Sequence, residues 1–242
     1  MNRAVTMARA SIIARCDQDD LCLPDRLEKQ FELLQDQKSW DCVFSHYNKF
    51  GKHRMWQNTD VQISTGNVRG YDPFLDGFLL HSTMMVAKES FIAAGGYHSE
   101  FYPADDYDLT LRLHQLCRIG MIEVPLVAYR FHAKSSTWRM FAEMEEKGRW
   151  AKNCYTLRQD GQSELSFGKF IKSDREKRKL FRRKLHLAYR YLVRAGGARY
   201  LDGETLRSIA LFTVAATLRP GPLVQRVIRA SSPRRRMRNK HK

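Results

Sequence analysis

The sequence predicts an α/β fold with a mainly parallel sheet, followed by a helical and strongly basic C-terminal region. Short β-rich runs alternate with segments of helical periodicity between Ser11 and His132, the pattern of a sheet covered by helices. The chain has 242 residues, enough for one full core and a smaller appendage, and 43% of them are hydrophobic, which excludes wholesale disorder. Polar residues follow the first and last predicted strands, where ligands bind in such sheets.

The first predicted strand runs from Ser11 to Arg15 and ends at the acidic segment Asp17–Asp20. Pro24 opens a helix, because its fixed φ suits a first helical turn. In this helix the i, i+4, i+7 spacing predicts one apolar face packed on the sheet, formed by Leu27, Phe31 and Leu34. The β-rich run from Asp41 to Tyr47 predicts the next strand.

The second half of the predicted body begins with a loop from Asn48 to Asp76 that can contain short strands. A strand from Ser82 to Ala87 and a short helix from Lys88 to Ala94 follow, and the glycines after Ala94 end that helix. The next helix begins at Asp106, with one apolar face formed by Leu109, Leu113 and Leu116. The last predicted strand runs from Met121 to His132 and is interrupted at Pro125.

The charge divides the chain into a near-neutral body and a basic end. Of the 42 basic and 26 acidic residues, 22 and 4 lie from Lys169 to Lys242, so this part carries +18 and the remainder −2. We therefore predict an α/β body over residues 1–140, a helical region over 141–230 and a disordered basic tail over 231–242. Because the charge is confined to one end and no recognition motif is present, the sequence does not predict a nucleic-acid partner.

The cysteines and the apolar runs indicate the compartment. The five cysteines are odd in number and form no C-x-x-C pair, which favours a reducing compartment and thiols that serve as small apolar filler. The N-terminus shows no signal-peptide pattern, and the longest apolar run, Ile209–Leu218, is shorter than the roughly 20 residues of a membrane span. The expectation is a cytoplasmic protein that can lie peripherally on the inner face of the cell membrane.

The acidic segment is the first candidate site. Three carboxylates within four residues repel each other unless a cation or solvent relieves them, and alternate residues after a strand, Asp17 and Asp19, can point at one ion. Mg²⁺ or Mn²⁺ accepts carboxylate oxygens and can bridge two phosphates of a nucleotide diphosphate. The alternative is an acidic turn that caps the following helix.

Three further features can carry chemistry. Asp106, at a helix N-terminus, can take a proton from an attacking hydroxyl, whereas simple capping is the better interpretation of Asp105 and Asp108. His132, at a strand end beside Arg130, can bind a metal while Arg130 meets phosphate, or it can be structural. Adjacent glycines at 95 and 96 allow a close backbone approach to a ligand, or a plain turn.

Six sequence elements in order give the stretch from Asn2 to Ser136 a resemblance to the family 2 glycosyltransferases, which have the GT-A fold. After Asn2 and its small neighbours, the elements are I-A-R-C-D-Q-D-D (Ile13–Asp20), P-D-R-L-E-K-Q (Pro24–Gln30), H-x-T-x-M (His81, Thr83, Met85), G-G-Y (Gly95–Tyr97), D-D-Y-D-L-T-L-R-L (Asp105–Leu113) and Y-R-F-H-A-K-S-S (Tyr129–Ser136). The resemblance covers rather more than half of the chain.

The resemblance implies an enzyme that moves a sugar from a nucleotide diphosphate to a hydroxyl of a saccharide or lipid-linked acceptor, with inversion, in bacterial surface polysaccharide synthesis. It implies Asp106 as catalytic base and Mg²⁺ or Mn²⁺ held by Asp17, Asp19 and His132. Donor and diphosphate contacts would come from those two aspartates and from Arg15, Gly95, Gly96 and Arg130.

Two departures from the family pattern stand out. The Glu that precedes the base in the family is Asp105 here, a shorter carboxylate. Family members also carry an initial strand and helix, and usually a second strand, before the position of Asn2, so residues 1–140 would form a partial GT-A domain. A start codon assigned too late, a truncated gene or completion by another chain would each explain this. The rival hypothesis is an inactive remnant that binds a membrane or another protein.

The segment from Arg175 to Arg194 combines apolar residues at helical spacing with a high density of Lys and Arg. This interfacial pattern suits an anionic membrane surface, where each basic residue contributes about 1 kcal/mol. The alternative is a solvated charged helix packed on the body.

Overall fold

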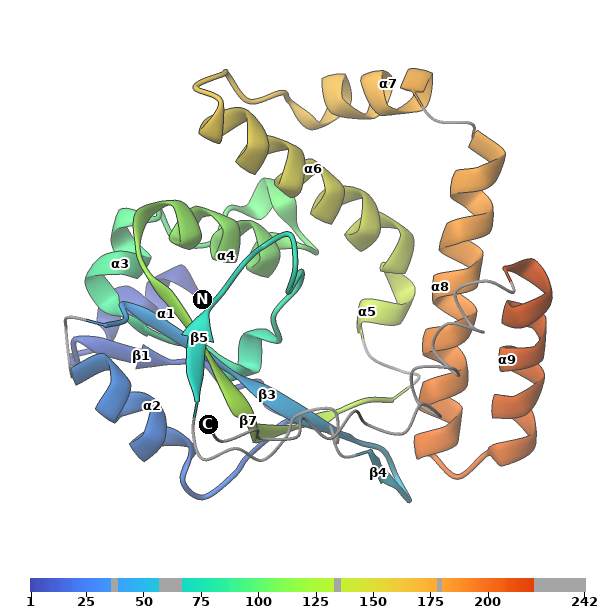
Figure 1. The fold of residues 1–242 in the computed structure, drawn as a ribbon, viewed down its shortest axis with the longest axis horizontal. Coiled ribbons are helices and arrows are strands. Elements are labelled where there is room, and N and C mark those ends of the chain that lie inside the picture. The colour runs from blue at the N-terminus through green and yellow to red at the C-terminus, as the bar shows by residue number, and fades with distance from the viewer. Residues whose placement is uncertain (36–38, 57–66, 133–135, 178–179, 220–242) are drawn as a thin grey trace, which may run out of the picture.

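The computed structural model describes residues 1–35, 39–56, 67–132, 136–177 and 180–219, and it has the predicted α/β class. Helix α2 (Arg26–Gln35) covers one face of a seven-stranded sheet, and helices α3 (Lys88–Ala93) and α4 (Asp105–Leu116) cover the other (Figure 1). Successive side chains of the strand that begins at Cys42 pack on opposite faces of the sheet. Cys42 and Phe44 pack under α3 and α4, whereas Val43 packs against Leu34 of α2.

The sheet has the strand order β1-β6-β3-β7-β2. Its longest pairing is parallel and joins β3 (Cys42–Phe50) to β7 (Ile119–Arg130). Strand β6 (Met85–Ala87) lies between β1 (Ile12–Ala14) and β3 and is antiparallel to both. Consequently β1, β3 and β7 share one direction, but the sheet is mixed rather than mainly parallel, because only the β3–β7 pairing among the described strands is parallel.

Three short strands complete the sheet, and all of them pair in the antiparallel sense. Strands β2 (Leu21–Cys22) and β5 (Val68–Gly70) pair with β7, and β4 (Met55–Trp56) pairs with the end of β3. Strand β3 therefore runs beyond its predicted end at Tyr47, and the predicted loop contains two short strands. At the predicted interruption, Pro125 lies opposite His46 where the register shifts, because proline cannot donate a ladder hydrogen bond.

Helix α2 buries a different face from the predicted one. Leu27 and Phe31 are 55% and 43% exposed, whereas Arg26 and Gln30 are completely buried together with Leu34. The polar pair is buried because it is hydrogen-bonded: Arg26 Nε donates to Gln30 Oε1 at 2.9 Å, and Gln30 Nε2 donates to the Thr83 carbonyl at 2.7 Å. The exposed apolar side chains instead line an open groove of about 560 Å³ beside β1.

Helix α4 forms the centre of two cores. Leu109 and Leu113 face the sheet as predicted, but Leu116 is 60% exposed. Leu111 faces away from the sheet and packs against α6 (Phe141–Gln159). There the Trp150 ring stacks on Phe101 with 4.0 Å between ring centroids. The predicted boundary at residue 140 thus falls just before a helix that packs on the body.

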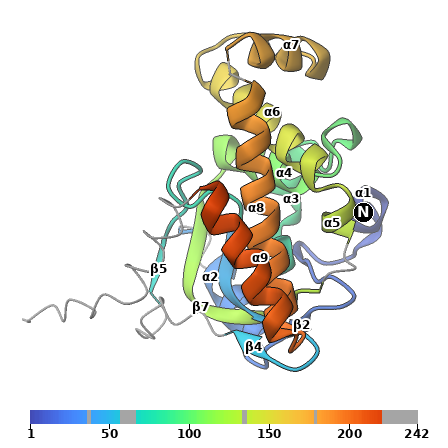
Figure 2. The ribbon, with the colours of Figure 1, turned by 90° about the vertical axis from the view of Figure 1, so that its right-hand side faces the viewer.

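The C-terminal helices follow β7 along the chain. After α5 (Ser136–Arg139) and α6, helix α7 (Phe167–Lys177) leads to α8 (Leu180–Leu201) and α9 (Thr205–Leu218), which lie side by side (Figures 1 and 2). Ala198 and Leu201 of α8 pack on Phe131 at the end of β7. Among the helices described, none is long and apolar enough to cross a membrane. The predicted tail over residues 231–242 lies outside the described residues.

Candidate active site

The acidic segment forms a turn directly after β1, closed by a hydrogen bond of 3.2 Å from the Asp20 N–H to the Asp17 carbonyl. Asp17 is half-buried and is held on both oxygens. The Arg15 guanidinium forms an ion pair with Oδ1, and Ser82 Oγ donates to Oδ2 at 2.9 Å. Because Ser82 lies in the 3₁₀ helix η1 (His81–Thr83), these contacts join the acidic turn to the segment that precedes β6.

The end of β7 is tied to the same turn. The Arg130 N–H donates to Asp20 Oδ1 at 2.9 Å, and Arg130 Nε donates to the Asp19 carbonyl at 3.1 Å. The side chains of Asp19 and His132 face each other, with 3.6 Å between Oδ2 and Nε2. The structure therefore brings together the two strand ends at which ligand-binding residues were predicted.

Asp20 shows that the negative charge of this turn is incompletely compensated. Burial raises the pKa of Asp20, and the charges of Asp17 and Asp19 raise it further. Its Oδ2 is buried and accepts no hydrogen bond from the residues that the structure describes. A divalent cation beside this turn would relieve the repulsion, and carboxylate and imidazole donors suit Mg²⁺ or Mn²⁺.

The described side chains do not form a complete metal site. No group of three His, Cys, Asp or Glu side chains is arranged to hold an ion in the part of the chain that is placed. Both oxygens of Asp17 are engaged, by Arg15 and by Ser82, while Asp19 and His132 face each other.

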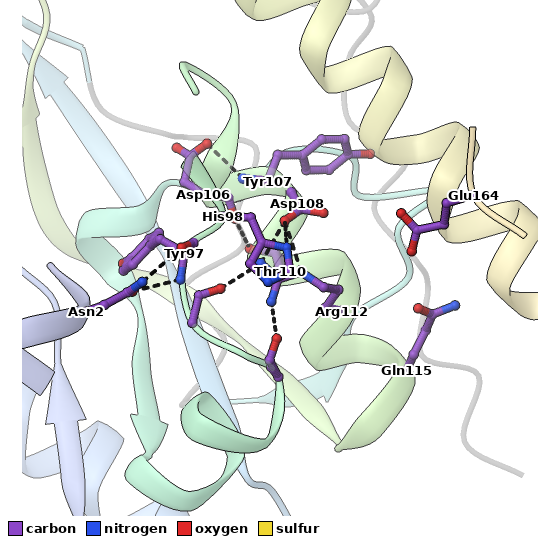
Figure 3. A network of polar contacts seen from close by, with 12 residues as sticks. Asn2, Tyr97, His98, Asp106, Tyr107, Asp108, Thr110, Arg112, Gln115 and Glu164 are labelled. Atoms are coloured by element: carbon purple, nitrogen blue, oxygen red, sulfur yellow. Dashed lines mark hydrogen bonds and ion pairs between the residues drawn. The ribbon is translucent and has the colours of Figure 1, made fainter. Parts of the chain in front are cut away.

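Asp106 lies in the first turn of α4, where its Oδ1 accepts the Tyr107 N–H at 2.7 Å (Figure 3). Burial raises the pKa of the Asp106 carboxyl to about 7, and the charges of Asp105 and Asp17 contribute to the shift. The two acidic motifs are therefore within electrostatic reach of one another, although 89 positions separate them in the sequence.

Tyr97 and His81 contact each other, and His81 directly precedes Ser82, the hydrogen-bond partner of Asp17. The Tyr97 hydroxyl is 2.5 Å from His81 Nε2. Burial raises the pKa of Tyr97, and Asp106 and Asp17 both raise it further, which places this hydroxyl near the carboxylates of both motifs. Burial lowers the pKa of His81 to about 3, so this imidazole is neutral at physiological pH.

The loop that contains Gly95 and Gly96, called the glycine loop, is held by contacts with helices α1 (Asn2–Met7) and α4. Gly95 and Gly96 have φ values of +80° and +66°, which side chains other than glycine rarely adopt. From α1, the Asn2 amide accepts the Tyr97 N–H at 2.8 Å and donates to the Tyr97 carbonyl at 2.9 Å (Figure 3). A Cβ on Gly96 would lie 2.8 Å from Asn2 Oδ1.

Arg112 holds the same loop from the other side, and Asp108 is its partner rather than a helix cap. Arg112 donates to the carbonyls of Ala94 and Gly96, and its Nη2 and Nε contact Asp108 Oδ2 at 2.7 and 2.9 Å (Figure 3). Asp108 is fully buried, so the capping interpretation was wrong for this residue. Its place four residues before Arg112 suits an ion pair along one helix face.

Sequence reasoning assigned no role to four residues that line or shape the site: Asn2, His81, Ser82 and Tyr97. Asn2, His81 and Tyr97 belong to sequence elements shared with the family, but the spacing of those elements does not show that they lie near the aspartates. Ser82 carried no signal, because 65 positions separate it from Asp17 and only the pairing of β6 beside β1 brings them together.

The fold and the site define an α/β protein in which an acidic turn beyond the end of β1 meets the end of the co-directional strand β7. The chain belongs to the family described as glycosyltransferase like family 2, whose model matches residues 1–158. It is 32% identical over 139 residues to the O-antigen biosynthesis glycosyltransferase WbnJ of Escherichia coli, covering 56% of this chain and 54% of WbnJ.

Two further likenesses are more distant. The amylovoran biosynthesis glycosyltransferase AmsE of Erwinia amylovora is 26% identical over 116 residues, covering 48% of this chain and 43% of AmsE. This chain thus spans about half the length of the curated relatives it matches. The crystal structure of S. aureus TarS 1-349 in complex with UDP superposes with a TM-score of 0.44 at 12% identity, covering 91% of this chain and 70% of that one.

Proposed function

We propose that this chain carries the catalytic acid–base machinery of an inverting, metal-dependent glycosyltransferase with a nucleotide-diphosphate sugar as donor and a saccharide or lipid-linked hydroxyl as acceptor. The observation that carries the proposal is the meeting of the acidic turn with the end of β7, where Asp19 faces His132 at 3.6 Å and the Arg130 N–H donates to Asp20. Burial raises the pKa of a second acidic group, Asp106, to about 7, and the charge of Asp17 contributes to that shift.

The proposed reaction is a single in-line displacement. The acceptor oxygen forms a bond to the anomeric carbon of the donor while the bond from that carbon to the diphosphate oxygen breaks. The acceptor proton passes to the Asp106 carboxylate, and the electron pair of the broken bond leaves with the nucleoside diphosphate. A base whose pKa lies near 7 suits proton removal at neutral pH, because enough of it is ionised and it still holds a proton firmly.

The diphosphate would lie at the acidic turn. Asp17, Asp19 and His132 would hold Mg²⁺ or Mn²⁺, which supplies positive charge to the departing diphosphate when bound. Arg15 and Arg130, which already contact the turn, can contribute positive charge to the same phosphates. The backbone of Gly95 and Gly96 would lie close to the sugar.

The relatives suggest the biological setting. WbnJ and AmsE are named for O-antigen and amylovoran biosynthesis, so we infer a role in surface polysaccharide synthesis with the reaction on the cytoplasmic side of the membrane.

A screen of nucleotide-sugars tests the proposed function. The matching donor should raise the melting temperature of the chain with Mn²⁺ present and to a lesser degree without it. The same donor should yield free nucleoside diphosphate when an acceptor saccharide is added. Donor binding in wild type and Asp106→Asn alike, with product only from wild type, is the expected pattern. No stabilisation by any donor, with or without Mn²⁺, would contradict the proposal.

We also propose that the C-terminal helices contact an anionic membrane surface. Helix α9 exposes Leu206, Ile209 and Val214 at 84%, 56% and 48%, and their spacing places them on one side of the helix. Arg207 lies beside them; its guanidinium pairs with Glu204 at 2.7 Å and would exchange that partner for a lipid phosphate.

Sedimentation with phospholipid vesicles tests this contact. The chain should bind vesicles that contain phosphatidylglycerol and not vesicles of pure phosphatidylcholine. The double variant Leu206→Ser, Ile209→Ser should bind several-fold more weakly, whereas Thr217→Ser should bind like wild type. Equal binding of both vesicle types, or unchanged binding of the double variant, would contradict the proposal.

A further inference from the structure

Two exposed thiols flank the acidic turn. Cys16 directly precedes Asp17, and Cys22 ends β2, so the turn lies between them in the sequence. Their sulfur atoms are 3.5 Å apart. The prediction that the cysteines are apolar filler fits Cys42 and Cys154, which are buried, but it is wrong for this pair.

Cys22 has an unusual neighbour. Arg26 is completely buried, and its Nη1 donates to Cys22 Sγ at 3.0 Å. Its other hydrogen bonds reach neutral acceptors, namely the Gln30 amide and the carbonyls of Arg15 and Met84. In the described part of the chain no carboxylate forms an ion pair with this guanidinium.

A buried guanidinium is costly unless a negative charge compensates it. Attack on a disulfide takes place through the thiolate, and Arg26 Nη1 lies at hydrogen-bond distance from the Cys22 sulfur that would carry the charge during that attack. Cys16, whose sulfur lies 3.5 Å away, is also exposed. The geometry thus contains an exposed thiol in contact with a buried guanidinium and a neighbouring exposed thiol that can complete a disulfide.

We propose that Cys16 and Cys22 form a reversible redox-modification site, in which a low-molecular-weight disulfide oxidises the pair to an intramolecular disulfide that encloses the acidic turn. This inference is independent of the proposed transferase activity.

The reaction balances in two exchanges. The Cys22 thiolate attacks one sulfur of the small disulfide, its S–S bond breaks, and one small thiolate leaves. The Cys16 sulfur then attacks Cys22 Sγ in this mixed disulfide, the Cys16–Cys22 bond forms, and the second small thiolate leaves. The two protons of the protein thiols pass to the released thiolates. The protein loses two electrons, which reduce the small disulfide to two thiols.

Oxidation would constrain the part of the chain that carries Asp17, Asp19 and Asp20, because these residues lie between the two linked positions. It would also convert the Cys22 sulfur, which accepts a hydrogen bond from Arg26 Nη1, into a disulfide sulfur, and Arg26 Nη2 donates to the Arg15 carbonyl at 2.6 Å. The backbone on both sides of the turn would therefore respond to the redox state of the pair.

The test is incubation of the reduced full chain with oxidised glutathione, with EDTA present so that bound metal plays no part. Intact mass should fall by two hydrogen atoms, and peptide mapping should find Cys16 linked to Cys22. Dithiothreitol should restore the original mass. Amide hydrogen exchange at residues 17–22 should be several-fold slower in the oxidised chain.

The variants separate the two thiols. Cys16→Ser should accumulate a stable glutathione adduct on Cys22, Cys22→Ser should form no intramolecular disulfide, and Cys117→Ser should behave like wild type. In Arg26→Lys, which keeps the charge but changes its geometry, adduct formation at Cys22 should slow several-fold. Failure of the wild-type chain to form the Cys16–Cys22 link, preferential linkage to Cys117, or a Cys22 no more reactive than Cys117 would overturn the proposal.

Discussion

The side-chain amide of Asn2 pairs with both backbone polar groups of Tyr97, through hydrogen bonds of 2.8 and 2.9 Å. This contact fastens helix α1 to the loop that carries Gly95 and Gly96. The same loop presents the Tyr97 hydroxyl to His81 and to the carboxylates of the site. The shape of the site thus depends on an N-terminal residue that takes no direct part in the proposed reaction.

Asn2→Ala should therefore loosen the glycine loop. It removes two partly solvated hydrogen bonds, which are worth about 0.5–1.5 kcal/mol each, so we expect a total loss of about 1–3 kcal/mol in the free energy of unfolding. Urea denaturation measures this loss. Thr6→Ala, which removes an exposed hydrogen bond to Arg3 in the same helix, should change stability by less than about 0.5 kcal/mol. Equal effects of the two variants would refute the special role of Asn2.

Gly96→Ala should destabilise the fold for two separable reasons. A Cβ at this position meets Asn2 Oδ1 at 2.8 Å, and its backbone has a φ of +66°. Gly77 has a φ of +65° but open space around it, so Gly77→Ala measures the backbone effect alone. We expect a loss of about 1 kcal/mol for Gly77→Ala and roughly 2–3 kcal/mol for Gly96→Ala in the same denaturation experiment. A loss for Gly96→Ala no greater than that for Gly77→Ala would show that the clash is relieved without cost.

The sequence predicted the α/β class and the meeting of Asp19 with His132, because strand ends and acidic spacing are local signals. It could not predict that Ser82 and Tyr97 approach the aspartates, since such contacts depend on which strands pair. It was wrong about α2, where periodicity favoured Leu27 and Phe31 over Arg26. Polar side chains can occupy a buried helix face when backbone carbonyls accept their hydrogen bonds. The spacing of apolar residues in a sequence does not show where such carbonyls lie.

Asp106→Asn should abolish most of the sugar transfer while donor binding is retained. The amide cannot take up the acceptor proton, and general-base catalysis contributes about 100- to 10,000-fold to such reactions. In the wild type, the transfer rate should rise with pH up to about 7 and then level off, because only ionised Asp106 is a base. Release of nucleoside diphosphate over a pH series measures both effects. Asp105→Asn is the matched control and should keep most of the activity; unchanged turnover in Asp106→Asn would remove Asp106 from the role of base.

Asp19→Ala should weaken the response to divalent cations. Asp19 faces His132 at 3.6 Å, so its loss removes one oxygen donor of the proposed metal site. Titration of Mn²⁺ or Mg²⁺ against donor-dependent thermal stabilisation measures the effect, which we expect as a shift of at least about tenfold in the half-saturating metal concentration. Asp25→Ala removes an exposed carboxylate that pairs with Lys29 and should leave the titration unchanged. A normal titration for Asp19→Ala would exclude Asp19 as a ligand.

The raised pKa of Asp106 also predicts how stability depends on pH. The folded chain holds the Asp106 proton up to a pH of about 7, whereas the usual value for an aspartate is 3.8. The neutral carboxyl therefore favours the folded state fully below about pH 4, and this contribution is lost as the pH rises to about 7. Asparagine stays uncharged throughout, so Asp106→Asn should be more stable than wild type by roughly 1–3 kcal/mol at pH 8, with little difference near pH 4.

Urea denaturation of both proteins across this pH range measures the difference. Thr6→Ala removes no ionisable group, so its stability relative to wild type should stay constant over the same series. A pH-independent difference between wild type and Asp106→Asn would mean that Asp106 titrates alike in the folded and unfolded chain. In that case the Asp106 carboxylate would be solvated like that of an ordinary helix cap. Its pKa would then not lie near 7, and the argument for Asp106 as a base at neutral pH would fail.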